Sequence, residues 1–172
     1  MTGSAGRRRA AGQVRGKKLR VYVDTSVFGG CFDPEYAAHS CRFFELVRSG
    51  RIIALVSQVV VDELNEAPAE VRNIFGSLPT ASISPVELTP DIIALRNAYL
   101  AAGILGPRWV DDATHVAAAT VARADAIVSW NFKHIVRVDK MRSYNQVNLL
   151  AGFGLLSIVS PQEVRFDEEK QR

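Results

Sequence analysis

The sequence predicts an α/β protein in which helices cover both faces of a mostly parallel sheet. Three observations lead to this fold class. Short runs rich in branched apolar residues alternate with segments of helical periodicity, which is the order of parallel strands joined by crossover helices. Most of these runs are continuous and do not alternate with polar residues, as expected of strands buried on both faces. The length of 172 residues suits a single domain with its own core.

The first third of the chain contains two strand-like runs with a helix between them. LRVYV, residues 19–23, predicts the first strand, and the glycines at 29–30 favour a loop or short turn after it. A helix with an apolar stripe then ends before Gly50, because glycine commonly follows a helix end. RIIALVS, residues 51–57, predicts the second strand, and Ser57 is expected to cap the helix that follows.

The middle of the chain holds two predicted helices and one brief strand. The first helix is short and is bracketed by Pro68 and the region 76–79. PVEL, residues 85–88, is a candidate strand. TPDIIALRNAYLAAG, residues 89–103, begins with a capping threonine and a proline and ends at a glycine, which are strong boundary signals for a helix. Residues 104–109 are expected to form a loop.

The last third repeats the alternation of helix and strand. Residues 110–124 are a small-residue helix able to pack closely on a sheet, and DAIVS, residues 125–129, is the third clear strand. A short helix is expected over 144–150. The apolar run GLLSIVS, residues 154–160, and PQEV, residues 161–164, then close the fold.

Charge divides the chain into three parts. The formal net charge is +3, and seven basic residues precede or enter the first strand. Without these seven the balance is −4, so the folded body should be mildly acidic. We therefore predict a basic arm over 1–18, a domain over 19–166 and a charged tail over 167–172. The arm either lies along a nucleic-acid backbone or is a solubilising tail. The seven residues are Arg7, Arg8, Arg9, Arg15, Lys17, Lys18 and Arg20.

Two further features bear on location. No run of ~18 apolar residues could span a bilayer, and no apolar segment resembling a signal peptide follows the basic arm. We expect a cytoplasmic protein with no membrane partner. Cys31 and Cys41 do not have metal-site spacing, so both are expected to be reduced packing residues.

Acidic and amide side chains occur near the predicted strand ends. Asp24 follows the first strand, Glu63 lies in the helix after the second, Asp111 and Asp112 begin the helix before the third, and Asn131 follows that strand. Ligands of parallel sheets bind at the carboxyl ends of the strands, so these groups could meet there. Gathered carboxylates need a compensating cation. Oxygen ligands suit Mg²⁺ or Mn²⁺.

Each of these residues also has an explanation without function. Asp24 could cap a turn, Glu63 could face solvent, and Asp111 or Asp112 could be a helix cap favoured by the dipole. Asn131 could cap the turn that follows its strand. The shared position near strand ends is what favours a site.

Four segments in order carry a resemblance to a known family. VYVDTSVFGG, SQVVVDELNEAP, DDATHVAAATVARADAIVSWNFKHIV and VSPQEV resemble the successive blocks of a PIN domain over about 19–164. This metal-dependent ribonuclease fold occurs in many toxins of prokaryotic toxin–antitoxin pairs. The resemblance implies a three-layer α/β/α sandwich, an acidic pocket with one or two Mg²⁺ or Mn²⁺ ions, and hydrolysis of RNA phosphodiester bonds. It also implies a homodimer and a cognate antitoxin as partner.

The resemblance assigns catalytic roles to positions that match the motifs. Asp24, Glu63 and Asp112 match the three acids that hold metal, and the adjacent Asp111 is a substitute ligand. Asn131 falls where the family usually has a fourth acid. An asparagine can orient water or coordinate through its carbonyl oxygen, but it adds no negative charge, which weakens the case for two tightly bound ions.

Neighbouring residues are candidates for binding substrate. Hydroxyls next to the first acid could contact metal or phosphate, basic residues at the rim could bind phosphate, and an aromatic face could stack on an unpaired base. Core packing or a solvated rim is the alternative for the rim residues. The substrate-binding candidates are Thr25, Ser26, Trp130, Lys133 and His134, with Phe132 as a second stacking face.

The leading hypothesis is a Mg²⁺- or Mn²⁺-dependent endoribonuclease, with a toxin of a two-protein pair as its biological form. The alternative is a catalytically weak RNA-binding or regulatory module, which Asn131 favours. A receiver-like phosphotransfer domain fits less well, because the pair Asp111 and Asp112 begins a helix. His115 shares a helix face with Asp112 and either supports a ligating carboxylate or packs in the core.

Overall fold

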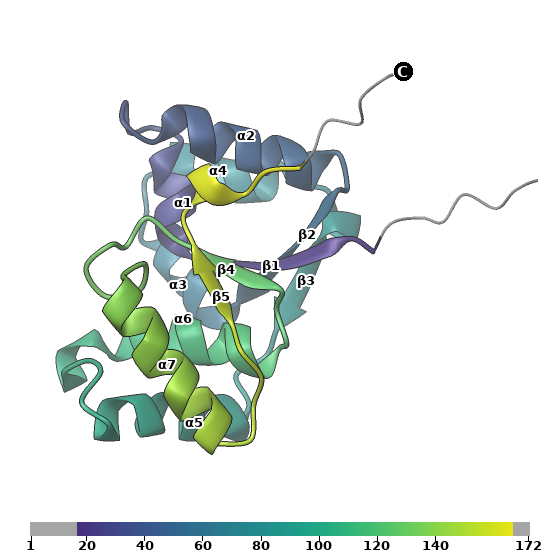
Figure 1. Ribbon diagram of the computed structural model, residues 1–172. Helices are drawn as coiled ribbons and strands as arrows, with labels where there is room; N and C mark the ends of the chain where they lie inside the picture. The colour runs from purple at the N-terminus through teal and green to yellow at the C-terminus, as the bar shows by residue number, and fades with distance from the viewer. Residues whose placement is uncertain (1–16, 167–172) are drawn as a thin grey trace, which may run out of the picture.

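The computed structural model describes residues 17–166 and contains one five-stranded sheet, in which every strand is parallel to its neighbours (Figure 1). The strand order is β3-β2-β1-β4-β5, so the first strand in the chain is the central one. Most of the predicted arm and the whole predicted tail lie outside the described residues, and the division into domains stays a prediction. The strands are β1 (Leu19–Val23), β2 (Ile52–Ser57), β3 (Ile83–Val86), β4 (Ala126–Val128) and β5 (Ser157–Val159).

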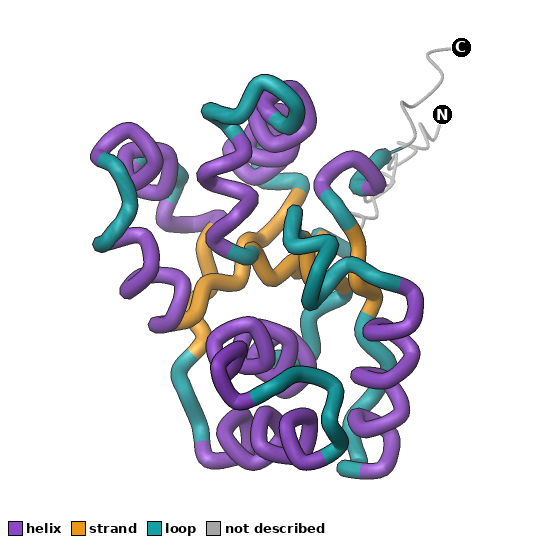
Figure 2. Tube along the Cα trace, turned by 90° about the vertical axis from the view of Figure 1, so that its left-hand side faces the viewer, coloured by secondary structure: helices purple, strands orange, loops and turns teal. Residues whose placement is uncertain are grey.

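Helices form a layer on each face of the sheet (Figures 1 and 2). One face is covered by α1 (Thr25–Gly30), α2 (Ala37–Arg48) and α4 (Ala69–Gly76). The other is covered by α5 (Pro90–Ala101), α6 (Val110–Val121) and α7 (Val138–Leu150). The short α3 (Gln58–Asn65) starts directly after β2. The predicted three-layer α/β/α fold with a parallel sheet is confirmed.

The register of the strands brings three polar residues to one level at the carboxyl edge. Tyr22 lies beside Leu55 of β2, and Val23 lies beside Val128 of β4. Continuing this register by one or two residues places Asp24 level with the last residue of β2, Ser57, and with the residue after β4, Ser129. The register therefore places Asp24, Ser57 and Ser129 in a polar row at the carboxyl ends of the three central strands.

Apolar packing on both faces explains why the central strand is continuous and apolar. Val21, Tyr22 and Val23 are each at most 1% exposed, although β1 begins with an exposed leucine. The alanines of α6 are buried, which lets this helix lie close to the sheet, as the small-residue pattern predicts. This close packing sets how near the polar side chains of α6 lie to the carboxyl edge of the sheet.

Several element boundaries differ from those predicted. Gly29 and Gly30 end helix α1 and do not form a loop. The last helix starts at Val138, earlier than the predicted 144, and its first residue is 72% exposed, so this turn shows little hydrophobic pattern. Residues 104–109, predicted as a loop, end in a 3₁₀ turn over Pro107–Trp109. The predicted strand over 85–88 is observed two residues earlier, as β3.

Of the two predicted helix caps, Thr89 is confirmed and Ser57 is wrong. Thr89 accepts a hydrogen bond from the backbone of Ile92, as expected of a cap. Ser57 occupies the cap position of α3, but its side chain makes no capping hydrogen bond and its hydroxyl bonds Tyr22. None of the helices within 17–166 is both long and apolar enough to cross a membrane.

Gly30 is predicted to be required for packing of α1 against Trp130. A Cβ at this position would clash with Ser40 Oγ and lie 2.6 Å from Trp130 Nε1, two atoms that are hydrogen-bonded at 2.8 Å. We expect Gly30→Ala to lower the free energy of unfolding by about 1–3 kcal/mol, the usual cost of overpacking. Urea denaturation measures the change.

Gly29→Ala is the matched control for this measurement. It lies in the same helix, and a Cβ there meets nothing within 4 Å. We expect this change to be neutral or slightly stabilising, because alanine favours helix by up to about 1 kcal/mol over glycine. Equal destabilisation by both changes would contradict the packing explanation.

The two cysteines should differ in reactivity. Cys31 is partly buried and Cys41 is exposed. Burial, assisted by the neighbouring Cys41, raises the pKa of the Cys31 thiol to about 12, so at pH 7.5 it carries almost no thiolate. We expect N-ethylmaleimide to modify Cys41 first in the native protein, as mapped by peptide mass spectrometry. Equally fast modification of Cys31 would contradict this account.

Candidate active site

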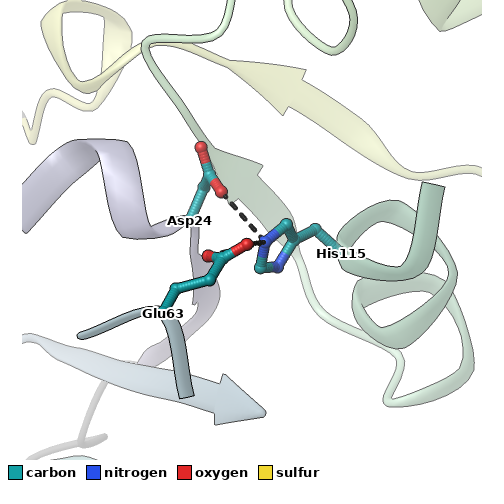
Figure 3. A group of neighbouring side chains, drawn as sticks. All are labelled: Asp24, Glu63 and His115. Atoms are coloured by element: carbon teal, nitrogen blue, oxygen red, sulfur yellow. Dashed lines mark hydrogen bonds and ion pairs between the residues drawn. The ribbon is translucent and has the colours of Figure 1, made fainter. Parts of the chain in front are cut away.

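Three ionisable side chains from three elements meet at the carboxyl edge of the sheet (Figure 3). Asp24 follows β1, Glu63 comes from α3, and His115 comes from α6. One ligand atom from each lies within 4.8 Å of the others. Asp24 is 6% exposed and His115 1% exposed, so most of this group is removed from solvent. The structure thus brings together Asp24 and Glu63, two of the predicted acids.

The Asp24 carboxylate is held by hydroxyls. Ser26 Oγ donates to Asp24 Oδ2 at 2.6 Å, and Ser129 Oγ donates to the same oxygen at 2.7 Å. Asp24 stands at the cap position of α1, yet its side chain makes no capping hydrogen bond. The capping explanation for Asp24 is therefore wrong. Its carboxylate is directed toward the other members of the group, as Figure 3 shows.

The Glu63 carboxylate is anchored from both sides. Thr25 Oγ1 donates a hydrogen bond to Glu63 Oε2, and His115 Nε2 lies 3.1 Å from the same oxygen. Burial alone would raise the pKa of Glu63. The hydrogen bond and charge of His115, with the Thr25 hydroxyl, outweigh burial and lower this pKa below its ordinary value. Glu63 is therefore ionised at neutral pH.

His115 connects the two carboxylates to a buried hydroxyl pair. Its Nε2 lies 3.4 Å from Asp24 Oδ1, and its Nδ1 lies 2.8 Å from Tyr22 Oη. Tyr22 Oη in turn bonds Ser57 Oγ at 2.6 Å. Burial disfavours the imidazolium, but Tyr22, Asp24 and Glu63 outweigh it and raise the pKa of His115 well above its usual range. Both ring nitrogens of the imidazolium are then donors.

The sequence does not predict that His115 contacts both acids. The sequence leaves it as a support for a carboxylate or as a packed residue. The three-residue spacing from Asp112 is the available signal, because residues three apart share a helix face. Nothing in the sequence indicates that Nε2 reaches Asp24 and Glu63, which lie 91 and 52 positions away.

Asp111 and Asp112 are adjacent at the start of α6 but lie in different environments. Asp112 is partly buried, and its Oδ2 lies 2.7 Å from His134 Nδ1. It is not a member of the group formed by Asp24, Glu63 and His115. Asp111 is exposed. Both lie within about one turn of His115, and of the two Asp112 is the partly buried one.

Asn131 acts as a cap within the loop after β4. Its Oδ1 accepts a hydrogen bond from the backbone of His134 at 2.9 Å, and its backbone N–H donates to Ser129 Oγ at 2.9 Å. This is the capping role that the sequence allows for Asn131 as an alternative. The contact joins the Ser129 hydroxyl, which holds Asp24, to His134, which holds Asp112.

Trp130 packs in the wall behind the site. It is 8% exposed, its ring stacks on Tyr36 with centroids 4.2 Å apart, and its Nε1 donates to Ser40. Its backbone N–H donates to Ser26 Oγ at 2.9 Å. The neighbouring Phe132 is 45% exposed, which makes it the more accessible of the two aromatic faces named from the sequence.

The remaining candidates for substrate binding occupy different environments. Thr25 and Ser26 use their hydroxyls on Glu63 and Asp24, so in this structure they orient the acids. Lys133 is exposed, and His134 is 8% exposed because it packs on Trp109. Lys133 is thus accessible, whereas the hydroxyls of Thr25 and Ser26 are already engaged with the acids.

The donor set fits a bound divalent cation. The buried group contains two carboxylates but one imidazolium, and the hydroxyls around them are neutral, so Asp24 and Glu63 keep excess negative charge. Asp112 of α6 is a further carboxylate, which lies outside this group and bonds His134. Carboxylate oxygens suit hard cations such as Mg²⁺ or Mn²⁺. His115 Nε2 contacts a carboxylate oxygen of both Asp24 and Glu63, so in this structure it positions the two acids.

Comparison with known proteins supports the fold. No family model and no curated protein matches the sequence. A chain from the crystal structure of VapBC2 from Rickettsia felis bound to a DNA fragment from their promoter is similar to this structure, with a TM-score of 0.53. The alignment has 12% sequence identity and covers 83% of this chain and 98% of that chain. At this identity the similarity establishes the architecture.

The His115 network predicts a specific dependence of stability on pH in metal-free protein. The folded pKa of His115 is raised, so its contribution is complete below the unfolded value of about 6.5 and is lost as pH rises through the folded pKa. The folded pKa of Glu63 is lowered, so its contribution is lost as pH falls. We expect the difference in unfolding free energy between wild type and His115→Gln to be larger at pH 6 than at pH 9.

Urea denaturation in EDTA at the two pH values measures this difference. His39→Gln is the control, because His39 makes no ion pair within residues 17–166. We expect its difference from wild type to change little with pH. A difference for His115→Gln that is constant, or that grows toward pH 9, would show that no imidazolium stabilises the site.

Proposed function

We propose that this protein is a Mg²⁺- or Mn²⁺-dependent endoribonuclease with a PIN-like fold, which hydrolyses RNA phosphodiester bonds. The observation that carries the proposal is the meeting of Asp24 and Glu63 beside His115 at the carboxyl edge of a parallel sheet. These acids are distant in sequence and costly to bring together. Such an arrangement is explained by a bound cation, and the edge is where ligands bind in this fold class.

Three carboxylates would hold the cation. Asp24 and Glu63 are already adjacent, and Asp112 is the third ligand, with Asp111 as its substitute. When bound, the ion lowers the pKa of a coordinated water and polarises the scissile phosphate. Asn131 completes the catalytic set by capping the loop that carries Ser129 and His134.

The chain's own groups orient these ligands. Ser26 and Ser129 fix one oxygen of Asp24 and leave the other facing His115. Thr25 and His115 fix Glu63, so that its carboxylate can position a water or the ion. Preset ligands reduce the reorganisation needed when a phosphodiester arrives.

We propose further that the protein is the toxin of a toxin–antitoxin pair and that a cognate antitoxin covers the acidic site. The motif resemblance supports this role, and so does the likeness to a chain of VapBC2, a structure that contains promoter DNA. A homodimer in the cytoplasm is part of the same proposal. RNA is the substrate, with Lys133 and His134 on the phosphate side.

A second candidate is a catalytically weak RNA-binding or regulatory module of the same fold. Asn131 favours it, because the amide stands where the family usually has a fourth acid and its oxygen is engaged with the His134 backbone. Asp112 also bonds His134 and is not in the tight group. Both candidates share the fold and RNA as ligand, and cleavage distinguishes them.

Loss of one ligand should abolish cleavage. We expect Asp24→Asn to lower the rate of Mn²⁺-dependent cleavage of a fluorescent single-stranded RNA by more than about a hundredfold, because metal catalysis is worth several kcal/mol. Mn²⁺ binding, measured by calorimetry, should fall in the same variant. Circular dichroism checks that the fold is retained.

Asp62→Asn is the matched control, since Asp62 is an exposed acid on α3 beside Glu63 and makes a hydrogen bond to Gln58. It should cleave at the wild-type rate. Unchanged cleavage in Asp24→Asn would overturn the nuclease proposal by revealing a contaminant. RNA binding by wild type without any cleavage would favour the regulatory module.

A further inference from the structure

A cluster of basic and aromatic side chains stands beside the candidate site at the start of α6. The Arg108 guanidinium carbon lies 4.6 Å from the centre of the Trp109 ring, and Lys133 Nζ lies 5.3 Å from it. The His134 ring is centred 4.1 Å from the same indole. Arg108 and Lys133 are separated by 25 positions, so Trp109 gathers cations from two different loops.

This cluster is linked directly to a site acid. His134 packs on Trp109 with its ring and lies 2.7 Å from Asp112 Oδ2 through Nδ1. The contacts therefore run without a break from Asp112 through His134 and Trp109 to Arg108 and Lys133. A group bound by these cations would therefore lie near Asp112.

Neither cation forms an ion pair with a carboxylate of residues 17–166. Both Arg108 and Lys133 are exposed, and over residues 17–166 no carboxylate lies within 4 Å of either. The adjacent Asp111 is not paired with them. Two exposed cations that make no ion pair within the described residues are available to an anionic ligand.

We propose that Arg108 and Lys133, ordered by Trp109, bind the phosphates of single-stranded RNA next to the scissile one. The inference rests on the proposed function for the identity of the ligand. A polyanion approaching three carboxylates is repelled unless cations close by neutralise its phosphates. The cluster supplies these charges on the α6 side of the site.

Trp109 acts as a platform for the cations in this arrangement. Its ring already contacts Arg108, Lys133 and His134, so stacking on a base would displace groups that bind it. A cation held over an indole gains stabilisation while keeping its outer face free for phosphate. Trp109 is accordingly a positioning residue, and the two cations make the contact.

Binding of RNA by a cleavage-deficient parent tests the inference without depending on catalysis. Fluorescence anisotropy of a labelled 12-nucleotide single-stranded RNA is measured with Asp24→Asn in EDTA over a range of salt. Arg108→Gln with Lys133→Gln is compared with Arg42→Gln and Arg142→Gln, which removes two exposed cations from α2 and α7. Thermal melting confirms that each protein folds.

We expect the Arg108 and Lys133 change to weaken binding at least about tenfold at low salt and to flatten the salt dependence. Loss of two phosphate contacts reduces the slope of log K against log salt by about 1.4, since each contact to a single strand contributes about 0.7. Trp109→Leu should weaken binding by about threefold to tenfold, because the cations lose their platform. The control pair should retain the slope of the parent.

Equal affinities and slopes in the two double variants would overturn the inference, as would a parent that does not bind this RNA at low salt. Binding that depends on Arg108 and Lys133 in a protein that never cleaves RNA would uphold the inference and refute the nuclease proposal. Cleavage that depends on Asp24, in a protein whose RNA affinity does not depend on Arg108 and Lys133, would support the nuclease proposal and overturn the inference.

Discussion

The structure depends on holding two carboxylates close together, one of which is almost fully buried. Asp24 is almost buried, and Glu63 shares a histidine nitrogen with it. Hydroxyls and one imidazolium hold these carboxylates, and most of those donors come from segments that end or follow the central strands. Removing the charges from water is costly unless each oxygen keeps a partner. The carboxyl edge of the sheet therefore positions the hydrogen-bond donors that these carboxylates need.

The strand order of the sheet places hydrogen-bond donors on both sides of Asp24. Because β1 is central, the residue after it is flanked by the ends of β2 and β4, and both neighbours contribute serines. Ser129 reaches Asp24 directly, whereas Ser57 acts through Tyr22 and His115. A strand at the edge of the sheet could receive donors from one side only. The position of β1 is thus a physical condition for burying Asp24.

The sequence is informative about this fold because its patterns are local. Continuous apolar runs, the Thr89 cap and the alanines of α6 each predict an element without reference to distant residues. The contacts of the site are set by packing of segments far apart, so the pairing of His115 with Glu63 could not be read from spacing. Ser57 shows the same limit, because its hydroxyl bonds Tyr22 in place of capping α3. Exposed segments such as the start of α7 lack the apolar pattern on which boundary prediction relies.

The segment Ser129-Trp130-Asn131 shows how an amide is used beside the candidate site. Ser129 holds Asp24, the Trp130 backbone holds Ser26, and Asn131 joins this segment to His134. An acid in place of Asn131 would add negative charge to a region that already contains Asp24, Glu63 and Asp112. The neutral amide of Asn131 adds no charge, and its oxygen is engaged with the His134 backbone. The amide therefore joins and caps this segment, and the proposed cation would be held by acids of other segments.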